Sequence, residues 1–502
     1  MSLARHLIRG STANLLDHAL KIGAVFYLTP LMARSLQTEG YGVWLLVMNV
    51  LGYFILLDLG VSFASIRQYA SALGAGDEAR QQALLTVSSR FFAWIGAVMV
   101  VLTVVFTPLM PWIAPSSLPA GQVMVPLAVC GAMTAFRFFF RMPLVLLRAQ
   151  VRYDLLALCS IGKTLTQLAL MTLALRGGHG LPGAAVAYAA SDGIELLLQI
   201  LCARRRTAPH GEKLAPEEHK RVARELFEYS RSILMVNVGE SLRLLVNPVL
   251  VGRLAGVAQV PVYSVGMRLI TILEDVINSL FGGQVLAAFS QLHGAGKAES
   301  LERQFRRVTA LTASFSAWAM AGVMCFGRPF FQRWLGPDFG QSYELLLILG
   351  LPYAFRFMQY PAHSLLYAIN RQQWLMRIVL AGGLASVVLS VPLGMAFGLR
   401  GVVMGAALET LLMYTVVMPW LVARVSSLNA VAYLLRDVLL PGVKGAALPM
   451  LFMVWALPRL EPDYFVLICH GAGYLVVFLI SLPWLVFDAE MRQMVRRALR
   501  RG

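Results

Sequence analysis

The sequence has few charged residues for its length. Only 14% of its 502 residues are Asp, Glu, Lys or Arg, whereas 58% are hydrophobic. An ordinary soluble domain carries about 25% charged residues. Apolar runs of roughly 20 residues, which is the length that crosses a bilayer, recur along the whole chain with short polar breaks. The composition therefore excludes an ordinary soluble multidomain protein and indicates a multi-pass membrane protein.

Patterns for metal, redox or covalent chemistry are also missing. The five cysteines are scattered within or beside apolar runs, without a Cys-x-x-Cys pair and without His partners at metal-ligand spacing. The sequence contains no nucleotide-binding or nucleophile motif. We therefore expect no metal and no cofactor, and we interpret the cysteines as packing residues.

Acidic residues are scarce relative to basic ones, with 26 Asp and Glu against 43 Lys and Arg and a net charge of +17. The basic residues lie in short loops between apolar runs and form no single patch, which argues against nucleic acid as a partner. Most of them fall on the cytoplasmic side when both termini are placed there. We expect a multi-pass protein of the bacterial inner membrane with both termini in the cytoplasm.

The apolar runs predict fourteen transmembrane helices. Gly, Pro and charged residues set their limits. The first six are predicted over 11–35, 41–66, 89–113, 122–147, 155–176 and 182–204. The next six are predicted over 229–252, 262–288, 307–327, 341–368, 374–396 and 401–424, and a last pair over 438–457 and 463–487.

An internal repeat relates the first six helices to the next six. Residues 135–138, Ala-Phe-Arg-Phe, return as residues 354–357, 219 positions later. Gly180-Leu-Pro-Gly183 corresponds to Gly398-Leu-Arg-Gly401, and the loop segment Gly74-Ala-Gly76 corresponds to Gly294-Ala-Gly296 in nearly the same register. Three matches in one register indicate a duplication.

The duplication predicts the domain organisation of an all-α polytopic membrane protein. We expect an N-terminal six-helix lobe over 1–206, a cytoplasmic linker over 207–228 and a C-terminal six-helix lobe over 229–425. Residues 426–502 add the last helix pair and a basic cytoplasmic tail. Because each copy has an even number of helices, the lobes should be related by an axis along the membrane normal and flank a cleft.

Polar stripes on two predicted helices are candidates to line this cleft. Asn14, Asp17 and Lys21 share one face of the first helix, and Asn237 and Glu240 repeat the spacing on the seventh, with Arg243 nearby. Ionisable residues inside a membrane usually face a cavity or a partner, because a charge near the bilayer centre costs roughly 2.5–3.5 kcal/mol. Buried pairs that hold helices together, or side chains that reach the interface, are the alternative interpretation.

Fixed cations in a cleft suit an anionic substrate, because Arg offers bidentate donors to phosphate oxygens. Carboxylates could neutralise those cations or carry a coupling ion. The substrate-binding candidates are Lys21, Arg137, Arg243, Arg268, Arg356, Asn14 and Asn237. The ion-coupling candidates are Asp17, Asp58, Glu240, Glu274, Asp275 and Glu409.

Two segments resemble a known superfamily. Tyr41-Gly-Val-Trp44 followed by Leu57-Asp-Leu-Gly-Val61 resembles the second helix of Wzx-type polysaccharide flippases in the multidrug/oligosaccharidyl-lipid/polysaccharide exporter superfamily. Residues 262–269 are similar to the eighth helix of the lipid II flippases of that superfamily, where an arginine matching Arg268 lines the cavity. The resemblance spans roughly residues 10–425 and implies two lobes with alternating access.

The resemblance implies a flippase for undecaprenyl-diphosphate-linked oligosaccharide, used in building a surface or exported polysaccharide such as O-antigen lipopolysaccharide or exopolysaccharide. Its partners would be the lipid-linked oligosaccharide, membrane lipids, and a polysaccharide polymerase and glycosyltransferases. A multidrug or cation exporter is an alternative, and so is a lipid II flippase, although the first helix lacks the closely spaced arginines of that group.

An enzyme acting on the same lipid-linked sugars is disfavoured. Membrane glycosyltransferases, polymerases and ligases need a substantial soluble domain or a long external loop to hold an acceptor, whereas every predicted periplasmic loop is short. A purely structural scaffold would not account for so many charges inside the membrane. The sequence therefore predicts a transporter and no enzymatic activity.

Overall fold

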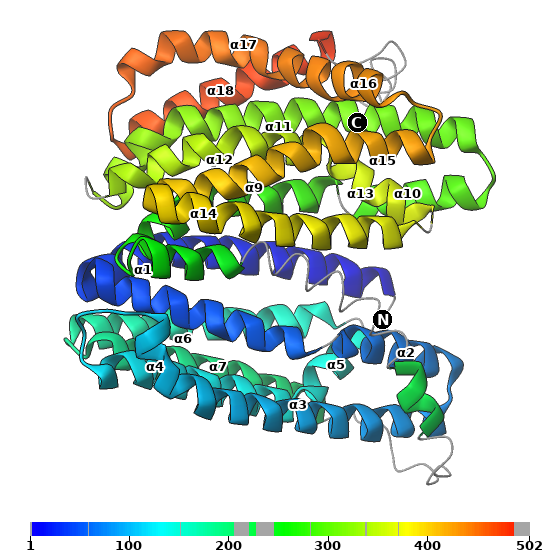
Figure 1. Ribbon diagram of the computed structural model, residues 1–502. Helices are drawn as coiled ribbons and strands as arrows, with labels where there is room; N and C mark the ends of the chain where they lie inside the picture. The colour runs from blue at the N-terminus through cyan, green and yellow to red at the C-terminus, as the bar shows by residue number, and fades with distance from the viewer. Residues whose placement is uncertain are drawn as a thin grey trace. The chain divides into compact units, whose positions relative to one another are not determined.

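The computed structural model describes residues 3–204, 220–226 and 245–485, apart from residues 59, 151, 282, 337, 338 and 370. All regular secondary structure in these ranges is helical. The chain forms two compact units, Met1–Pro261 and Val262–Gly502, called here the N-terminal unit and the C-terminal unit. The predicted fold class, an all-α polytopic membrane protein, is confirmed (Figure 1).

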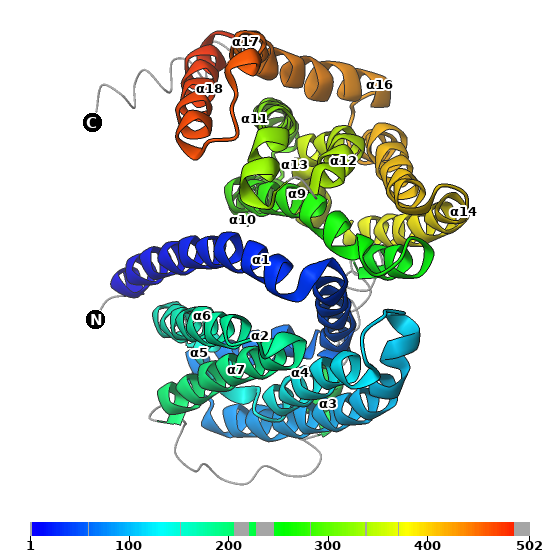
Figure 2. The same ribbon diagram turned by 90° about the vertical axis from the view of Figure 1, so that its left-hand side faces the viewer.

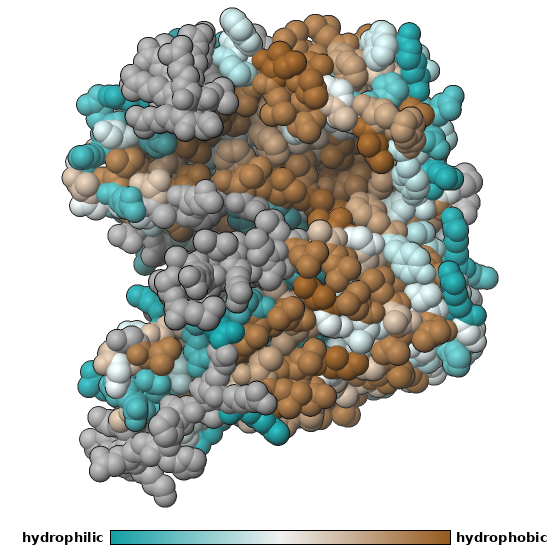
Figure 3. Space-filling model, turned by 180° about the vertical axis from the view of Figure 1, so that it is seen from behind, coloured by the Kyte–Doolittle hydropathy of each residue, from teal (hydrophilic) through white to brown (hydrophobic). Residues whose placement is uncertain are grey.

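Nine helical stretches in the described part of the chain are long and apolar enough to cross a membrane. A single stretch can hold two predicted spans. For example, Gln373–Val425 includes both 374–396 and 401–424. Figure 3 shows hydrophobic surface residues gathered along the middle of the helices and hydrophilic ones toward the helix ends. This distribution is what a bilayer requires of the surface that it surrounds.

The N-terminal unit contains seven labelled α-helices and one 3₁₀ turn. They are α1 (Leu3–Ile55), η1 (Leu56–Asp58), α2 (Val61–Ala75), α3 (Glu78–Ile113), α4 (Ala120–Phe139), α5 (Met142–Ala149), α6 (Tyr153–Arg176) and α7 (Gly180–Arg204). Short helices over residues 220–226 and Leu245–Leu254 complete the described part. Helix α1 packs along α6, and α3 packs along α4 (Figure 2).

The C-terminal unit repeats this series and then extends it. It contains α9 (Gln259–Phe281), α10 (Gly283–Gly294), α11 (Ala298–Trp334), α12 (Gly340–Met358), α13 (Tyr360–Ala368), α14 (Gln372–Leu412), a π-helical segment η3 (Met413–Val417) and α15 (Met418–Val425). The extension consists of α16 (Ala430–Ala432), a π-helical segment η4 (Tyr433–Leu439), α17 (Leu440–Ala456), η5 (Leu457–Arg459) and α18 (Tyr464–Leu485).

Breaks inside the helices occur close to the predicted limits. Helix α1 is interrupted at Gln37, with φ of 58°, and α14 at Gly398, with φ of 59°, so each holds one predicted span and the first part of the next. The predicted spans 41–66 and 122–147, by contrast, are not single helices. The first is broken by η1 and by Gly60 at φ of 77°, and the second ends at Phe139 before α5 begins with Pro143 in its first turn.

The duplication is visible in these breaks. Helix α4 is separated from α5 at residues 140–141, and α12 is separated from α13 at Gln359, which is 219 positions after Phe140. A long helix followed by a short one therefore recurs in the repeat register. The predicted linker, residues 207–228, lies mostly outside the described residues, and the predicted lobe boundaries stay predictions.

The helix pair that follows the second repeat packs on α11. Trp318 of α11 stacks on Phe478 of α18, with ring centroids 4.4 Å apart, and the hydroxyl of Tyr474 donates to the carbonyl of Trp318 at 2.8 Å. On α17, Gly445 lies against Ser314, whose hydroxyl donates to the carbonyl of Pro441 at 2.8 Å. Small residues let membrane helices approach closely enough for such contacts.

We expect Gly445→Ala to destabilise the C-terminal unit. A Cβ at this position would lie 2.6 Å from the Cβ of Ser314 and 2.8 Å from its Cα, so α17 must move away from α11. Overpacking of this kind costs about 1–3 kcal/mol. The melting temperature of the purified protein should fall. Gly471→Ala on α18 is the matched control, because a Cβ there meets nothing within 4 Å; equal melting temperatures for the two variants would contradict this account.

Candidate functional site

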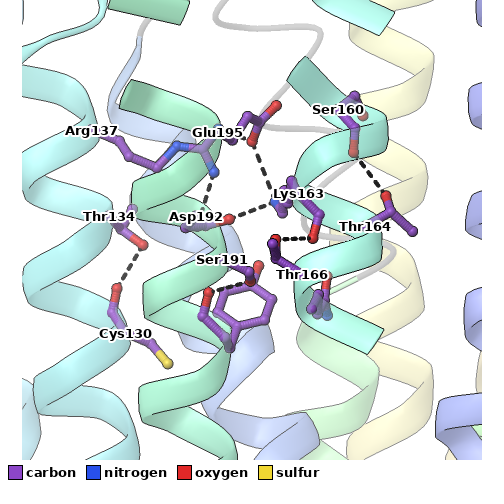
Figure 4. Close-up of polar contacts among 12 residues, drawn as sticks. Cys130, Thr134, Arg137, Ser160, Lys163, Thr164, Thr166, Ser191, Asp192 and Glu195 are labelled. Carbon is purple, nitrogen blue, oxygen red and sulfur yellow. Dashed lines mark hydrogen bonds and ion pairs between the residues drawn. The ribbon is translucent and has the colours of Figure 1, made fainter. Parts of the chain in front are cut away.

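Four charged side chains from three helices meet inside the N-terminal unit (Figure 4). Asp192 and Glu195 lie three positions apart on α7 and therefore share a face of the helix. Arg137 of α4 lies 2.9 Å from Asp192 and 2.9 Å from Glu195. Lys163 of α6 lies 2.5 Å from Asp192 and 3.6 Å from Glu195. We call these four residues the N-terminal charge network.

The N-terminal charge network is largely shielded from solvent. The side chain of Asp192 is only 5% exposed, and that of Arg137 is 21% exposed. Two cations and two anions cancel, which lowers the cost of holding ions in a medium of low dielectric constant. Lys163 also lies 5.6 Å from the ring of Tyr188. Arg137, predicted to bind substrate, is thus held by carboxylates of its own unit, and its role in substrate binding stays a prediction.

The matching arginine of the C-terminal unit has a different partner. Arg356 of α12 lies 2.6 Å from Glu274 of α9, and its side chain is 6% exposed. Its guanidinium lies 5.9 Å from the rings of Tyr353 and Tyr414. The repeat has therefore kept the arginine, whereas α7 supplies acidic partners in one unit and α9 supplies one in the other.

The position of Lys163 also differs between the repeats. The residue 219 positions later is Gly382 of α14, and Glu409 occupies the space beside it, since a Cβ on Gly382 would lie 2.5 Å from Oε1 of Glu409. Glu409 is buried and accepts a hydrogen bond from the hydroxyl of Thr410 at 3.1 Å. In the C-terminal unit a buried carboxylate thus lies beside the position that corresponds to Lys163.

A polar cluster surrounds the α12–α13 break. Gln359 donates to the main-chain carbonyl of Tyr414, which belongs to the π-helical segment η3. The hydroxyl of Tyr414 lies 3.3 Å from Nε2 of His363, and the hydroxyl of Tyr360 donates to Asn278 of α9 at 2.7 Å. π-Helical segments often occur at functional sites. The sequence patterns did not indicate this cluster, because its members come from three helices.

Three further predicted residues, Lys21, Asp17 and Asp58, have partners close in the sequence. Lys21 lies 2.7 Å from Asp17, one helical turn away on α1; the lysine side chain is 47% exposed and the aspartate side chain 9%. Asp58 accepts from the hydroxyl of Ser62 at 2.7 Å, and Ser62 in turn accepts from Arg141 at 3.3 Å. The predicted charged stripe of the first helix therefore contains one ion pair.

Arg268 and Asp275 lie on the exposed side of α9. They are seven positions apart, whereas Val265, Ile270 and Ile277 of the same helix are buried. No ion pair of either residue occurs among the described side chains. The guanidinium of Arg268 is thus exposed on a helix that is otherwise packed through an apolar face.

Four predicted site residues cannot be placed. Asn237, Glu240 and Arg243 lie outside the described residues, and so does the side chain of Asn14 on α1. The predicted equivalence of the first and seventh helices therefore stays a prediction. Among the residues that the structure describes, no group of three or more His, Cys, Asp or Glu side chains is arranged to hold a metal ion.

Comparison with known proteins defines the class. A family model described as polysaccharide biosynthesis protein matches residues 31–344. The fold is that of an inward-facing multidrug resistance MATE family transporter of the MOP superfamily, at 14% identity and a TM-score of 0.69, covering 80% of this chain and 95% of that one. No curated protein matches the sequence significantly.

Two other solved structures share the fold. Lipid II flippase MurJ, in an inward closed conformation, is 12% identical with a TM-score of 0.69, covering 94% of this chain and 98% of that one. A MOP superfamily transporter from Pyrococcus furiosus is 16% identical with a TM-score of 0.56, covering 84% and 95%. This chain belongs to the polysaccharide biosynthesis protein family, and its fold is similar to that of MOP superfamily transporters. The resemblance found in the sequence is confirmed.

We expect Asp192→Asn to destabilise the protein by removing an anion that faces two cations. Breaking a buried ion pair from one side costs about 3–5 kcal/mol, because the remaining charge is left without its partner. The melting temperature should fall, and adding Lys163→Met should restore part of the loss.

Glu344→Gln is the matched control for this change. Glu344 pairs with Arg400 at 2.6 Å, but the two side chains are 50% and 60% exposed, so the pair contributes about 0–1 kcal/mol. If Glu344→Gln lowered the melting temperature as much as Asp192→Asn, burial of the N-terminal charge network would not explain its contribution to stability.

Proposed function

We propose that this protein flips an undecaprenyl-diphosphate-linked oligosaccharide from the cytoplasmic to the periplasmic leaflet by alternating access. The product would supply the biosynthesis of a surface or exported polysaccharide. Membership of the polysaccharide biosynthesis family and the fold of a MOP superfamily transporter support this proposal. A transporter role is also consistent with a chain made almost wholly of helices.

The observation that carries the proposal is the exposed guanidinium of Arg268. The other two predicted arginines that the structure describes are engaged by carboxylates, Arg137 by α7 and Arg356 by Glu274. Arg268 has no acidic partner among the described residues, so it can offer its donors to a substrate. A guanidinium matches phosphate oxygens in bidentate geometry, and a diphosphate offers several such oxygens.

Lys21 is the second cation assigned to the diphosphate. Its ammonium group is paired with Asp17, but nearly half of its side chain is exposed, so it can exchange that partner for a phosphate. Arg137, Arg243 and Arg356 remain secondary candidates. The sugars would contact the polar residues Asn14 and Asn237, and the polyprenyl chain would remain in the bilayer.

The carboxylates are assigned to coupling. The candidates are Asp17, Asp58, Glu240, Glu274, Asp275 and Glu409. Those that hold a cation in place, as Glu274 does for Arg356, could release it when a proton or metal cation binds. The membrane potential offers another source of energy, since moving one charge through 100 mV is worth about 2.3 kcal/mol.

The proposed function implies which reactions come before and after the transport step. Glycosyltransferases would build the lipid-linked oligosaccharide on the cytoplasmic face, and a polymerase would extend it on the periplasmic face. We place the protein in the bacterial inner membrane with both termini in the cytoplasm, where positive charges beside the spans accumulate.

We expect Arg268→Ala to reduce translocation of a fluorescent undecaprenyl-diphosphate oligosaccharide in proteoliposomes by roughly tenfold or more, since a hydrogen bond to a charged group contributes about 1.5–3 kcal/mol. The amount of reconstituted protein should not change. Translocation is measured as label that becomes accessible to an impermeant quencher, with protein-free vesicles as the baseline.

Arg459→Ala is the matched control for Arg268→Ala. Arg459 is also exposed, but its guanidinium rests 4.4 Å from the ring of Trp455 at the end of α17, and it is not a predicted site residue. Equal loss of transport and of folded protein in Arg268→Ala would reassign the residue to folding. Absence of translocation by the unmodified protein, together with efflux of an organic cation, would favour a multidrug exporter.

A further inference from the structure

A cavity of about 1460 Å³ opens in the C-terminal unit, and none of the predicted site residues that the structure describes lines it. Its walls are the beginning of α11, the end of α13, the beginning of α14 and the end of α15, with Asp437 of η4 at one side. These helix ends gather on one side of the unit (Figure 1). The cavity exceeds the 300–1,000 Å³ that is usual for a small-molecule pocket.

The lining of this cavity is basic. Five arginines line it, against three carboxylates. The carboxylates are already engaged: Glu299 pairs with Arg303 at 2.8 Å, Asp437 with Arg306 at 3.0 Å, and Glu302 accepts from the hydroxyl of Ser427 at 2.6 Å. The positive charge of the lining is therefore only partly compensated within the protein.

Two arginines of the lining have no acidic partner among the residues that the structure describes. They are Arg371, between α13 and α14, and Arg424, near the end of α15. The guanidinium of Arg424 lies 4.5 Å from the ring of Trp420, which holds it at the helix end. Both side chains are exposed, so their donors can reach a ligand in the cavity.

The rest of the lining is apolar. Leu365 and Leu421 are buried in the cavity wall, and Trp374 contributes an aromatic ring beside Arg371. Tryptophan is typical of the zone where lipid headgroups meet hydrocarbon. An arginine pair next to leucines and a tryptophan fits a ligand that has both a phosphate and a hydrocarbon part.

In the N-terminal unit, the position that corresponds to this cavity is filled by a segment of the protein itself. Its short helix over residues 220–226 buries Val222 and Leu226 against α2, α3 and α5, and Glu225 pairs with Arg80 at 2.8 Å. The contacts on α5 include Leu146, whose counterpart 219 positions later, Leu365, lines the cavity of the C-terminal unit. In one repeat this space is thus taken by a protein segment that packs two apolar side chains there and pairs one carboxylate, that of Glu225, with Arg80, although the segment also carries Lys220, Arg221 and Arg224.

We infer that the cavity binds an anionic glycerophospholipid of the adjoining leaflet, with its phosphate on Arg371 and Arg424 and its glycerol and upper acyl chains along the apolar wall. Basic pockets between transmembrane helices on the cytoplasmic side bind such headgroups in other membrane proteins. The basic tail of this chain, which includes Arg492, Arg496 and Arg497, would be repelled by the same arginines.

The test is native mass spectrometry of the full-length protein in detergent, titrated with phosphatidylglycerol or with phosphatidylcholine of the same chain length. The unmodified protein should bind one phosphatidylglycerol at least tenfold more tightly than phosphatidylcholine. The variant R371Q/R424Q should lose this preference by about tenfold, and each single variant should lose part of it.

The control variant is R333Q/R459Q, which removes the same charge from two other exposed arginines that stack on aromatic rings, Tyr464 and Trp455. It should keep the preference, and circular dichroism should show equal helix content in both double variants. An unchanged preference in R371Q/R424Q would overturn the inference. Full competition by millimolar glycerol phosphate, which has no acyl chain, would also overturn it, since the site would then serve a soluble anion.

Discussion

The low dielectric constant of the bilayer is the constraint on which the rest of the structure depends. An ion taken out of water there is tolerated only beside an opposite charge or at a surface that water can reach. The described charges of this chain follow that division. Arg356 is buried and Arg137 is half-buried beside carboxylates, whereas Arg268 lies on the exposed side of α9. The division separates charges that hold helices together from charges that can meet a ligand.

Much of the fold follows from the sequence. Apolar runs and their Gly, Pro and charged limits predicted the helices, and a 219-residue register predicted the repeat, because both depend on local composition or on direct comparison of segments. Helix breaks were harder to predict. Gln37 adopts a positive φ without being glycine, and the break before α5 falls at Phe140 and Arg141, a single charge that the predicted span 122–147 runs through.

The candidate site was predicted only as a set of residues. The sequence marked Arg137 and Glu274 as charges inside the membrane, but the partner of each depends on which helices pack together. Glu274 is 82 positions from Arg356, and no periodicity links them. The spacing of Asp192 and Glu195 was the one local sign of the N-terminal charge network, since it places both carboxylates on one face of α7. The cavity lined by Arg371 and Arg424 joins segments that only the tertiary fold brings together.

The different partners of the two duplicated arginines make the repeats mechanically unequal. Neutralising both acids that face Arg137 would remove the ion pairs that join α7 to α4, whereas neutralising Glu274 would remove an ion pair that joins α9 to α12. Neutralising the carboxylates would therefore affect α7, the last long helix of the first repeat, but α9, the first helix of the second repeat. A gene duplication supplies two copies of a shape, and a change in the acidic partners of one arginine ties different helices together in each copy.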